Sequence, residues 1–260
     1  MKRKIRIDEL VVERGLAQDI VQARALIMAG DVYTDSRTLD KAGESVPGDI
    51  SVFLKKTSCP YVSWGGMKLR AALDYFSFDP TGMCCLDIGA STGGFCDVLL
   101  KSSVKHITAL DVAYGIIALK IRSDPRVRMV EKTNFRQLPD DFFSEKFDLI
   151  VADVSFISLK KILPKAGIFL KDNGTILALI KPQFEAAQEK VEPGGVVSNR
   201  KVHEEIVTDL SECIKASGIY LKDFFPLPFF HAQKNVEYFS QWNKTPFEIQ
   251  SSTIAEKCHL

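Results

Sequence analysis

Apolar runs bounded by polar turns alternate with amphipathic stretches along most of the chain after about residue 60. The runs favour buried strands, and the stretches, which have apolar side chains every three or four positions, favour helices. Strands that are apolar throughout and alternate with helices predict a parallel sheet covered on both faces. The expected strands are Met83–Leu86, His106–Leu110, Val127–Val130, Phe147–Ala152 and Thr175–Ile180, and the expected helices lie near Phe95–Lys101, Leu159–Phe169 and Val202–Ala216.

Two later apolar segments, Tyr220–Phe225 and Val236–Gln241, lie close together in the sequence. We expect them to pair as an antiparallel edge of the same sheet. The sequence is polar from about Asn243, which indicates a loose C-terminal tail over 243–260. The predicted fold class is therefore α/β, a Rossmann-like domain with a mostly parallel sheet and an antiparallel edge.

The first part of the chain has a different character and predicts a small separate module. Ile5–Leu10 resembles a short helix with Asp8 as a possible N-cap, and Ala17–Met28 has helical spacing that ends at Gly30. Strand-like pieces at 32–34 and 50–54, with a turn at 47–49, complete two small helices and a small sheet. We therefore expect a module over 1–56, a linker over 57–61 and a larger domain over 62–242.

The composition is that of a soluble globular protein, with 46% hydrophobic and 26% charged residues in 260. This excludes a mainly disordered chain, a collagen-like fibre and a coiled-coil rod. A net charge of +1 excludes a uniformly basic nucleic-acid coat but allows a local basic face. Apolar runs are far shorter than the ~20 residues that span a bilayer. The basic N-terminus leads into no apolar segment, so we expect a cytoplasmic protein without membrane contact.

The six cysteines include no C-x-x-C pair of the kind found in zinc or redox sites. In a chain of this length without a secretory signal, we expect the cysteines to be reduced and mostly buried thiols. We expect no metal site.

The most informative segment is Asp87–Phe95, a glycine-rich loop between a predicted strand and a predicted helix. Its glycines do not fit the G-x-G-x-x-G fingerprint of dinucleotide-binding proteins. The segment does match G-x-S-x-G, so a hydrolase with Ser91, Asp153 and His203 stays open, although no oxyanion loop precedes it. The third interpretation is a site for S-adenosylmethionine.

That cofactor needs acidic residues at the ends of two consecutive strands. Asp87 would hold the amino group of the methionine part, and Asp111 would accept hydrogen bonds from both ribose hydroxyls. Asn134 would meet the adenine, and Asp153 is a further candidate for binding the cofactor. The loop would admit the methionine chain and the ribose through Gly89, Ala90, Ser91, Thr92, Gly93, Gly94 and Phe95.

Five ordered segments resemble the signatures of the TlyA family, and the match runs from about residue 3 to about residue 240. They are Tyr61–Leu69, Asp87–Phe95, Asp124–Val127, Asp153–Leu159 and Lys181–Glu185. The family bears the name hemolysin A, but its members act as ribosomal RNA 2′-O-methyltransferases with a catalytic domain similar to FtsJ. The resemblance implies a cytidine ribose in ribosomal RNA as the methyl acceptor and ribosomal subunits as partners.

The N-terminal module resembles the α-L RNA-binding module of a small-subunit ribosomal protein. The resemblance implies that basic side chains of its second helix face RNA, and the candidates are Arg24 and Arg14, with Lys2, Arg3 and Lys4 from the N-terminus. Family members often have Ser-Arg before this helix, where Asp19 and Ile20 stand here. One basic contact is therefore missing.

The resemblance also implies the Lys-Asp-Lys-Glu set for which FtsJ-like enzymes are known, at Lys68, Asp153, Lys181 and Glu237. Lys181 is the expected general base, because desolvation and a second lysine favour its neutral form. The family usually has arginine where Trp64 stands, and this indole could stack on a base. The segment 231–235 before Glu237 also departs from the family pattern.

Two other classes stay open at this stage. A non-catalytic RNA-binding factor for ribosome assembly would tolerate loss of Lys181, whereas an enzyme would not. A membrane-active hemolysin is disfavoured by the lack of a spanning segment or a strongly basic amphipathic helix.

Overall fold

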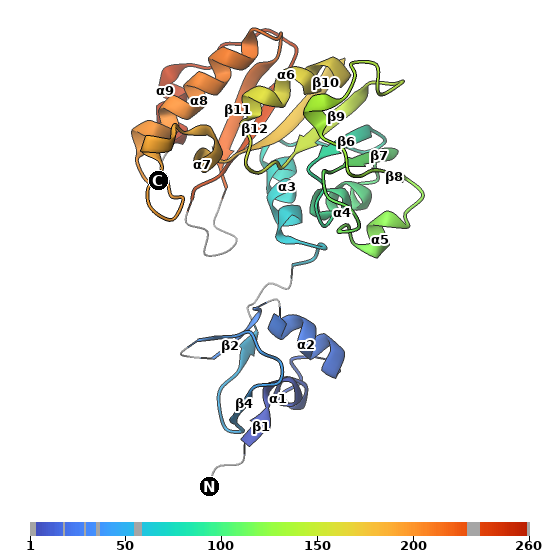
Figure 1. The fold of residues 1–260 in the computed structure, drawn as a ribbon, viewed down its shortest axis with the longest axis vertical. Helices are drawn as coiled ribbons and strands as arrows, with labels where there is room; N and C mark the ends of the chain where they lie inside the picture. Colours follow the sequence, from blue (N-terminus) through green and yellow to red (C-terminus); the bar gives the residue numbers. More distant parts are fainter. Residues whose placement is uncertain are drawn as a thin grey trace. The chain divides into compact units, whose positions relative to one another are not determined.

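The computed structural model describes residues 4–17, 19–28, 30–34, 37–54, 59–227 and 235–258. The chain forms two compact units, Met1–Pro60 and Tyr61–Leu260, each with its own core (Figure 1). The boundary lies close to the predicted linker.

The first unit contains two short helices and two small antiparallel sheets, one of two strands and one of three in the order β3-β2-β5. The core is built from apolar residues of both helices and the strands, among them Leu10, Ile27 and Val32. Its elements are β1 (Lys4–Arg6), α1 (Ile7–Glu13), α2 (Ile20–Met28), β2 (Val32–Tyr33), β3 (Thr38–Leu39), β4 (Ser45–Pro47) and β5 (Phe53–Leu54).

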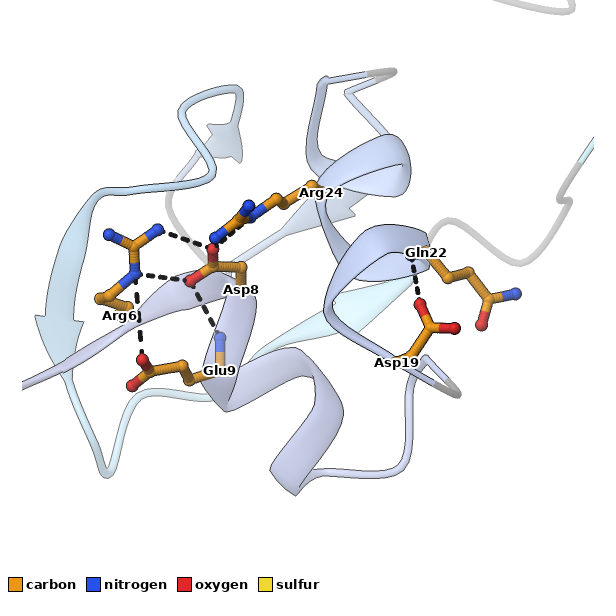
Figure 2. A network of polar contacts seen from close by, with 6 residues as sticks. All are labelled: Arg6, Asp8, Glu9, Asp19, Gln22 and Arg24. Atoms are coloured by element: carbon orange, nitrogen blue, oxygen red, sulfur yellow. Dashed lines mark hydrogen bonds and ion pairs between the residues drawn. The ribbon is translucent and has the colours of Figure 1, made fainter.

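Both predicted helix starts in this unit are wrong. Residues 4–6 pair with 45–47 as an antiparallel ladder, so the first helix begins at Ile7, and the buried Asp8 lies in its first turn without being the N-cap. The second helix begins at Ile20 because Asp19 caps it. The Asp19 Oδ1 atom accepts a hydrogen bond of 2.7 Å from the Gln22 amide (Figure 2).

The second unit is built on a seven-stranded sheet with the order β11-β12-β10-β9-β6-β7-β8. The five strands from β10 to β8 run parallel, while β12 is antiparallel to both β10 and β11, as predicted. The strands are β6 (Cys84–Ile88), β7 (His106–Leu110), β8 (Val127–Val130), β9 (Phe147–Ala152), β10 (Leu170–Ile180), β11 (Tyr220–Pro226) and β12 (Tyr238–Asn243).

Two apolar cores cover the two faces of this sheet, because successive strand residues point to opposite sides. Ile150 of β9 joins the core beneath α6 and α8, whereas Leu149 and Val151 join the core beneath α3 and α4. The helices are α3 (Trp64–Tyr75), α4 (Gly94–Lys101), α5 (Leu119–Arg122), α6 (Leu163–Phe169), α7 (Pro182–Glu185), α8 (Arg200–Lys215) and α9 (Ser251–Lys257), with 3₁₀ turns at Phe135–Gln137, Leu159–Lys161 and Gln188–Lys190.

The predicted loose tail is corrected by the structure. Residues 251–257 form α9, which packs on α8 and β11. Ile254 and Cys258 are buried there, so a few apolar side chains in a polar sequence are enough to dock this helix.

Cys85, Cys96 and Cys258 are buried, Cys59 and Cys84 are half-buried, and Cys213 is exposed. In the described part of the chain, no helix combines the length and the apolar character needed to cross a membrane.

Candidate functional site

The loop after β6 is held in a conformation that glycine makes possible. Gly89 has φ +84°, and a Cβ atom there would lie 2.5 Å from the Asp153 carbonyl oxygen. Gly93 has φ +94°, and its Cβ atom would lie 2.9 Å from Ile117. Ser91 between them also adopts a left-handed φ of +49°. The two glycines therefore let the loop pack against the neighbouring strand end and α5.

A cavity of about 650 Å³ opens beside this loop at the carboxyl ends of β6, β7 and β9. Ligands bind at this edge in open α/β sheets. Five predicted cofactor residues line the cavity: Gly89, Ser91, Asp111, Asn134 and Asp153. The other predicted cofactor residues are not part of the described lining, and these are Asp87, Ala90, Thr92, Gly93, Gly94 and Phe95.

Asp111 fixes the loop against the end of β7. Its Oδ2 atom accepts a hydrogen bond of 2.7 Å from the Ser91 amide, and its Oδ1 atom accepts one of 2.8 Å from the Ala113 amide. A carboxylate oxygen can accept a second hydrogen bond, so Asp111 can also receive two ligand hydroxyls. Asn134 caps a 3₁₀ turn through its Oδ1 atom, which leaves its amide nitrogen as a donor toward a ligand.

Asp87 lies behind the loop, completely buried on β6. Its Oδ2 atom accepts a hydrogen bond of 3.1 Å from the Cys96 thiol, while its Oδ1 atom has no hydrogen-bond partner in the described residues. Burial raises the pKa of Asp87 to about 7, and the charges of Asp153 and Asp111 add to this effect. Three carboxylates therefore share one region, which favours a cationic ligand.

The four residues of the expected Lys-Asp-Lys-Glu set form two ion pairs. Lys68 Nζ lies 2.5 Å from Glu237 Oε2, and both side chains are buried. Lys181 Nζ lies 2.5 Å from Asp153 Oδ1 and donates a hydrogen bond of 3.0 Å to Ser155 Oγ. Each lysine thus has its own carboxylate.

The strand register brings the two ion pairs together at the carboxyl ends of the parallel strands. Ile180 at the end of β10 pairs with Tyr238 at the start of β12. Lys181 and Glu237 therefore occupy the next positions on neighbouring strands. Asp153 follows β9, which is the parallel neighbour of β10 on its other side. Lys68 reaches Glu237 from α3, and Trp64 is half-buried at the first position of that helix, one turn earlier.

Several features of this edge are absent from the sequence interpretation. Phe156 is 90% exposed, and its ring lies 5.0 Å from that of Phe184, with both residues lining the cavity. Glu185 accepts hydrogen bonds from Ser158 and from the backbone of Leu159. A phenylalanine three residues after a predicted active-site aspartate, in the turn that follows the strand, is the sequence signal that could have identified the first of these features.

The hydrolase alternative does not fit the geometry. His203 is completely buried on α8, where one ring nitrogen lies 2.8 Å from the Tyr238 hydroxyl and the other 2.8 Å from the Val197 carbonyl oxygen. Both nitrogens are therefore engaged, and neither is available to a serine nucleophile. Burial also lowers the pKa of His203, which keeps the ring neutral.

In the first unit, a buried carboxylate organises two of the basic side chains. Asp8 Oδ2 lies 2.7 Å from Arg6 Nη2 and 2.9 Å from Arg24 Nε (Figure 2). The hydrogen bond from Arg6 holds the pKa of Asp8 well below its usual range. The Arg6 and Arg24 side chains are nevertheless about half exposed, at 46% and 52%. Both guanidinium groups are thus held in place and still reach solvent.

The other predicted RNA-binding residues of the first unit are less constrained. Arg14 donates a hydrogen bond of 3.2 Å to the Gly48 carbonyl oxygen, and Lys4 is exposed on β1. Lys2 and Arg3 lie outside the described residues.

Comparisons with known proteins agree with this architecture. Residues 61–244 match the FtsJ-like methyltransferase family. The 16S/23S rRNA (cytidine-2′-O)-methyltransferase TlyA of Mycobacterium tuberculosis is 38% identical over 246 residues, which cover 94% of this chain and 91% of the relative. Hemolysin A of Brachyspira hyodysenteriae is 33% identical over 239 residues, or 92% of this chain and 99% of the relative.

Among solved structures, a candidate hemolysin from Streptococcus thermophilus is 35% identical, with a TM-score of 0.76. The match covers 99% of this chain and 95% of the Streptococcus thermophilus chain. These matches confirm the Rossmann-like methyltransferase fold and the family resemblance. The chain belongs to the TlyA and hemolysin A family, whose larger domain is an FtsJ-like methyltransferase domain.

Proposed function

We propose that this protein is an S-adenosylmethionine-dependent 2′-O-methyltransferase that acts on ribosomal RNA, with a cytidine ribose as the acceptor. The observation that carries the proposal is the convergence of Lys68, Asp153, Lys181 and Glu237 at one strand edge, where Asp153 also lines the cavity. The activity named for the relative from Mycobacterium tuberculosis supports this choice of substrate.

The residues of the cavity fit S-adenosylmethionine. Asp111 would bind the ribose hydroxyls and Asn134 would donate to the adenine. Asp87 lies behind the cavity lining, and its orphaned Oδ1 atom suits a cationic group nearby, since a positive charge would favour its ionised form. When bound, the cofactor supplies an electrophilic methyl group on a sulfonium.

Within this proposal, Lys181 orients the ribose hydroxyl and, in its neutral form, receives the proton that the hydroxyl loses during attack. Asp153 and Ser155 hold the Lys181 amino group in place. The Lys68–Glu237 pair lies next to Lys181 on the β12 side and is fixed by burial. Alignment of the hydroxyl with the methyl group supplies much of the acceleration.

The first unit, expected as a module over 1–56, would contact the RNA backbone. Arg6 and Arg24 are the best-placed residues, because Asp8 fixes both guanidinium groups and arginine pairs well with phosphate oxygens. Trp64 would contact the RNA near the active site. The cytoplasmic location stays a prediction.

A transfer assay tests the proposal directly. The protein is incubated with unmodified ribosomal subunits and methyl-labelled S-adenosylmethionine, and the product is mapped by mass spectrometry. Lys181→Ala should abolish the label on ribose. Lys171→Ala is a matched control, because Lys171 pairs with Asp148 between the same two strands at the opposite edge of the sheet. No transfer by the wild-type protein to any subunit would favour a non-catalytic RNA-binding factor.

A further inference from the structure

We infer that Glu185 is a positioning residue. It holds the segment 153–159, which forms one wall of the cavity, in its active geometry. The inference rests on the proposed function for its meaning, but it is carried by contacts of Glu185 that the proposed mechanism does not use.

Glu185 joins the two segments that follow β9 and β10. Its Oε2 atom accepts a hydrogen bond of 2.5 Å from Ser158 Oγ, and its Oε1 atom accepts one of 2.8 Å from the Leu159 amide. Glu185 ends α7, which begins directly after Lys181. Both oxygens of one carboxylate are therefore used to tie the segment 153–159 to the segment 181–185.

The tied segment is under conformational strain. Phe156 adopts a left-handed φ of +62°, a conformation that is unfavourable for a residue with a side chain. Its side chain is 90% exposed, so burial does not hold this backbone in place. Lys181 contacts the segment at Asp153 and Ser155, on one side of Phe156, and Glu185 holds it at Ser158 and Leu159, on the other side.

The strained segment is also a wall of the cavity. All six residues from 153 to 158 line it, whereas Glu185 is not among the described lining residues. Burial raises the pKa of Glu185, and the hydrogen bonds from Ser158 and Leu159 oppose that rise by favouring the carboxylate. Glu185 thus acts on the cofactor through the segment that it holds, without touching the reacting atoms.

The test compares Glu185→Ala, Glu185→Gln and Ser158→Ala with the wild-type protein. Glu189→Ala is the matched control, since Glu189 is an exposed carboxylate four residues away on the next turn. Binding of S-adenosylhomocysteine is measured by calorimetry at a temperature well below the melting point of every variant. The maximal rate of methyl transfer is measured at saturating cofactor.

We expect Glu185→Ala to weaken S-adenosylhomocysteine binding about tenfold and to lower the maximal rate to a similar extent, because two charge-assisted hydrogen bonds are lost. Glu185→Gln should recover most of the loss, since its carbonyl oxygen can still accept from Leu159. The losses in the double variant of Glu185→Ala with Ser158→Ala should be less than additive, since the two residues share one hydrogen bond.

Unchanged binding and rate in Glu185→Ala would overturn the inference, as would additive losses in the double variant. A fall in melting temperature with normal binding would show that Glu185 is merely structural and would also overturn it. The binding assay needs no RNA. A wild-type protein that binds S-adenosylhomocysteine but transfers no methyl group would therefore contradict the proposed function and leave the test of Glu185 valid.

Discussion

Asp87→Asn should remove a pH dependence of stability that originates in the core of the larger unit. The wild-type carboxyl is completely buried and has one oxygen without a partner in the described structure, so burial raises its pKa to about 7 from an ordinary value of 3.8. Asparagine resembles the protonated form, and its side-chain oxygen can still accept a hydrogen bond from Cys96.

The sign and size of the effect follow from the two pKa values. Between about pH 4 and pH 7 the folded protein binds a proton at Asp87 that the unfolded chain has released, so raising the pH favours unfolding. One pKa unit corresponds to about 1.4 kcal/mol, and the full shift of about 3 units therefore corresponds to about 4 kcal/mol. Between pH 5 and pH 8, this group alone should lower the free energy of unfolding by about 3 kcal/mol.

Urea unfolding at pH 5 and pH 8 measures this change in both proteins. The loss of stability from pH 5 to pH 8 should be smaller in Asp87→Asn than in the wild type by about 3 kcal/mol, because all other titrating groups are shared. Equal pH dependence in the two proteins would refute the reasoning. With the proposed cofactor, wild-type affinity should rise about tenfold from pH 6 to pH 8 as Asp87 ionises, and the affinity of Asp87→Asn should not.

In a urea titration, Gly94→Ala should lower the free energy of unfolding by about 2 kcal/mol, because its Cβ atom would lie 2.8 Å from a backbone nitrogen of α3. Gly65→Ala is the control and should be neutral, because its Cβ atom would make only ordinary contacts. Lys68→Met should lower the free energy of unfolding by about 3 kcal/mol, because it leaves Glu237 buried and unpaired. Replacing both residues by apolar ones should lower the free energy of unfolding by less. Asp8→Asn should lower the stability of the first unit by about 2 kcal/mol at pH 7, seen as faster amide exchange in α1. Because the pKa of Asp8 is lowered, this wild-type advantage should decrease progressively as the pH falls below about 4.

The strands of the larger domain were the most predictable part of the fold. The ranges His106–Leu110, Val127–Val130 and Phe147–Ala152 agree with the structure because each is a mostly apolar run bounded by polar turns. The short N-terminal segments were less predictable, since in a few residues a strand and a helix present similar apolar patterns. The start of the first helix depends on pairing with residues 45–47, which local sequence does not reveal.

The candidate site was also predictable from the sequence only in part. The resemblance predicted Lys68, Asp153, Lys181 and Glu237, and the structure pairs Lys68 of α3 with the distant Glu237 and Lys181 with Asp153. Their roles stay predictions. The contacts of Glu185 could not be predicted, because they depend on the orientation of side chains on two strand ends and on the shape of the loop between them.

The C-terminal helix has a consequence for one edge of the seven-stranded sheet. β11 is an edge strand, and an uncovered edge offers backbone groups to strands of other molecules. α9 packs against this strand, and Lys257 at its end forms an ion pair with Asp223 of β11 and a hydrogen bond of 3.0 Å with the Tyr75 hydroxyl. The match to the FtsJ-like family ends at residue 244, before α9. A chain shortened to that boundary would uncover the sheet edge together with the apolar side of α8, and self-association through β11 is the expected result.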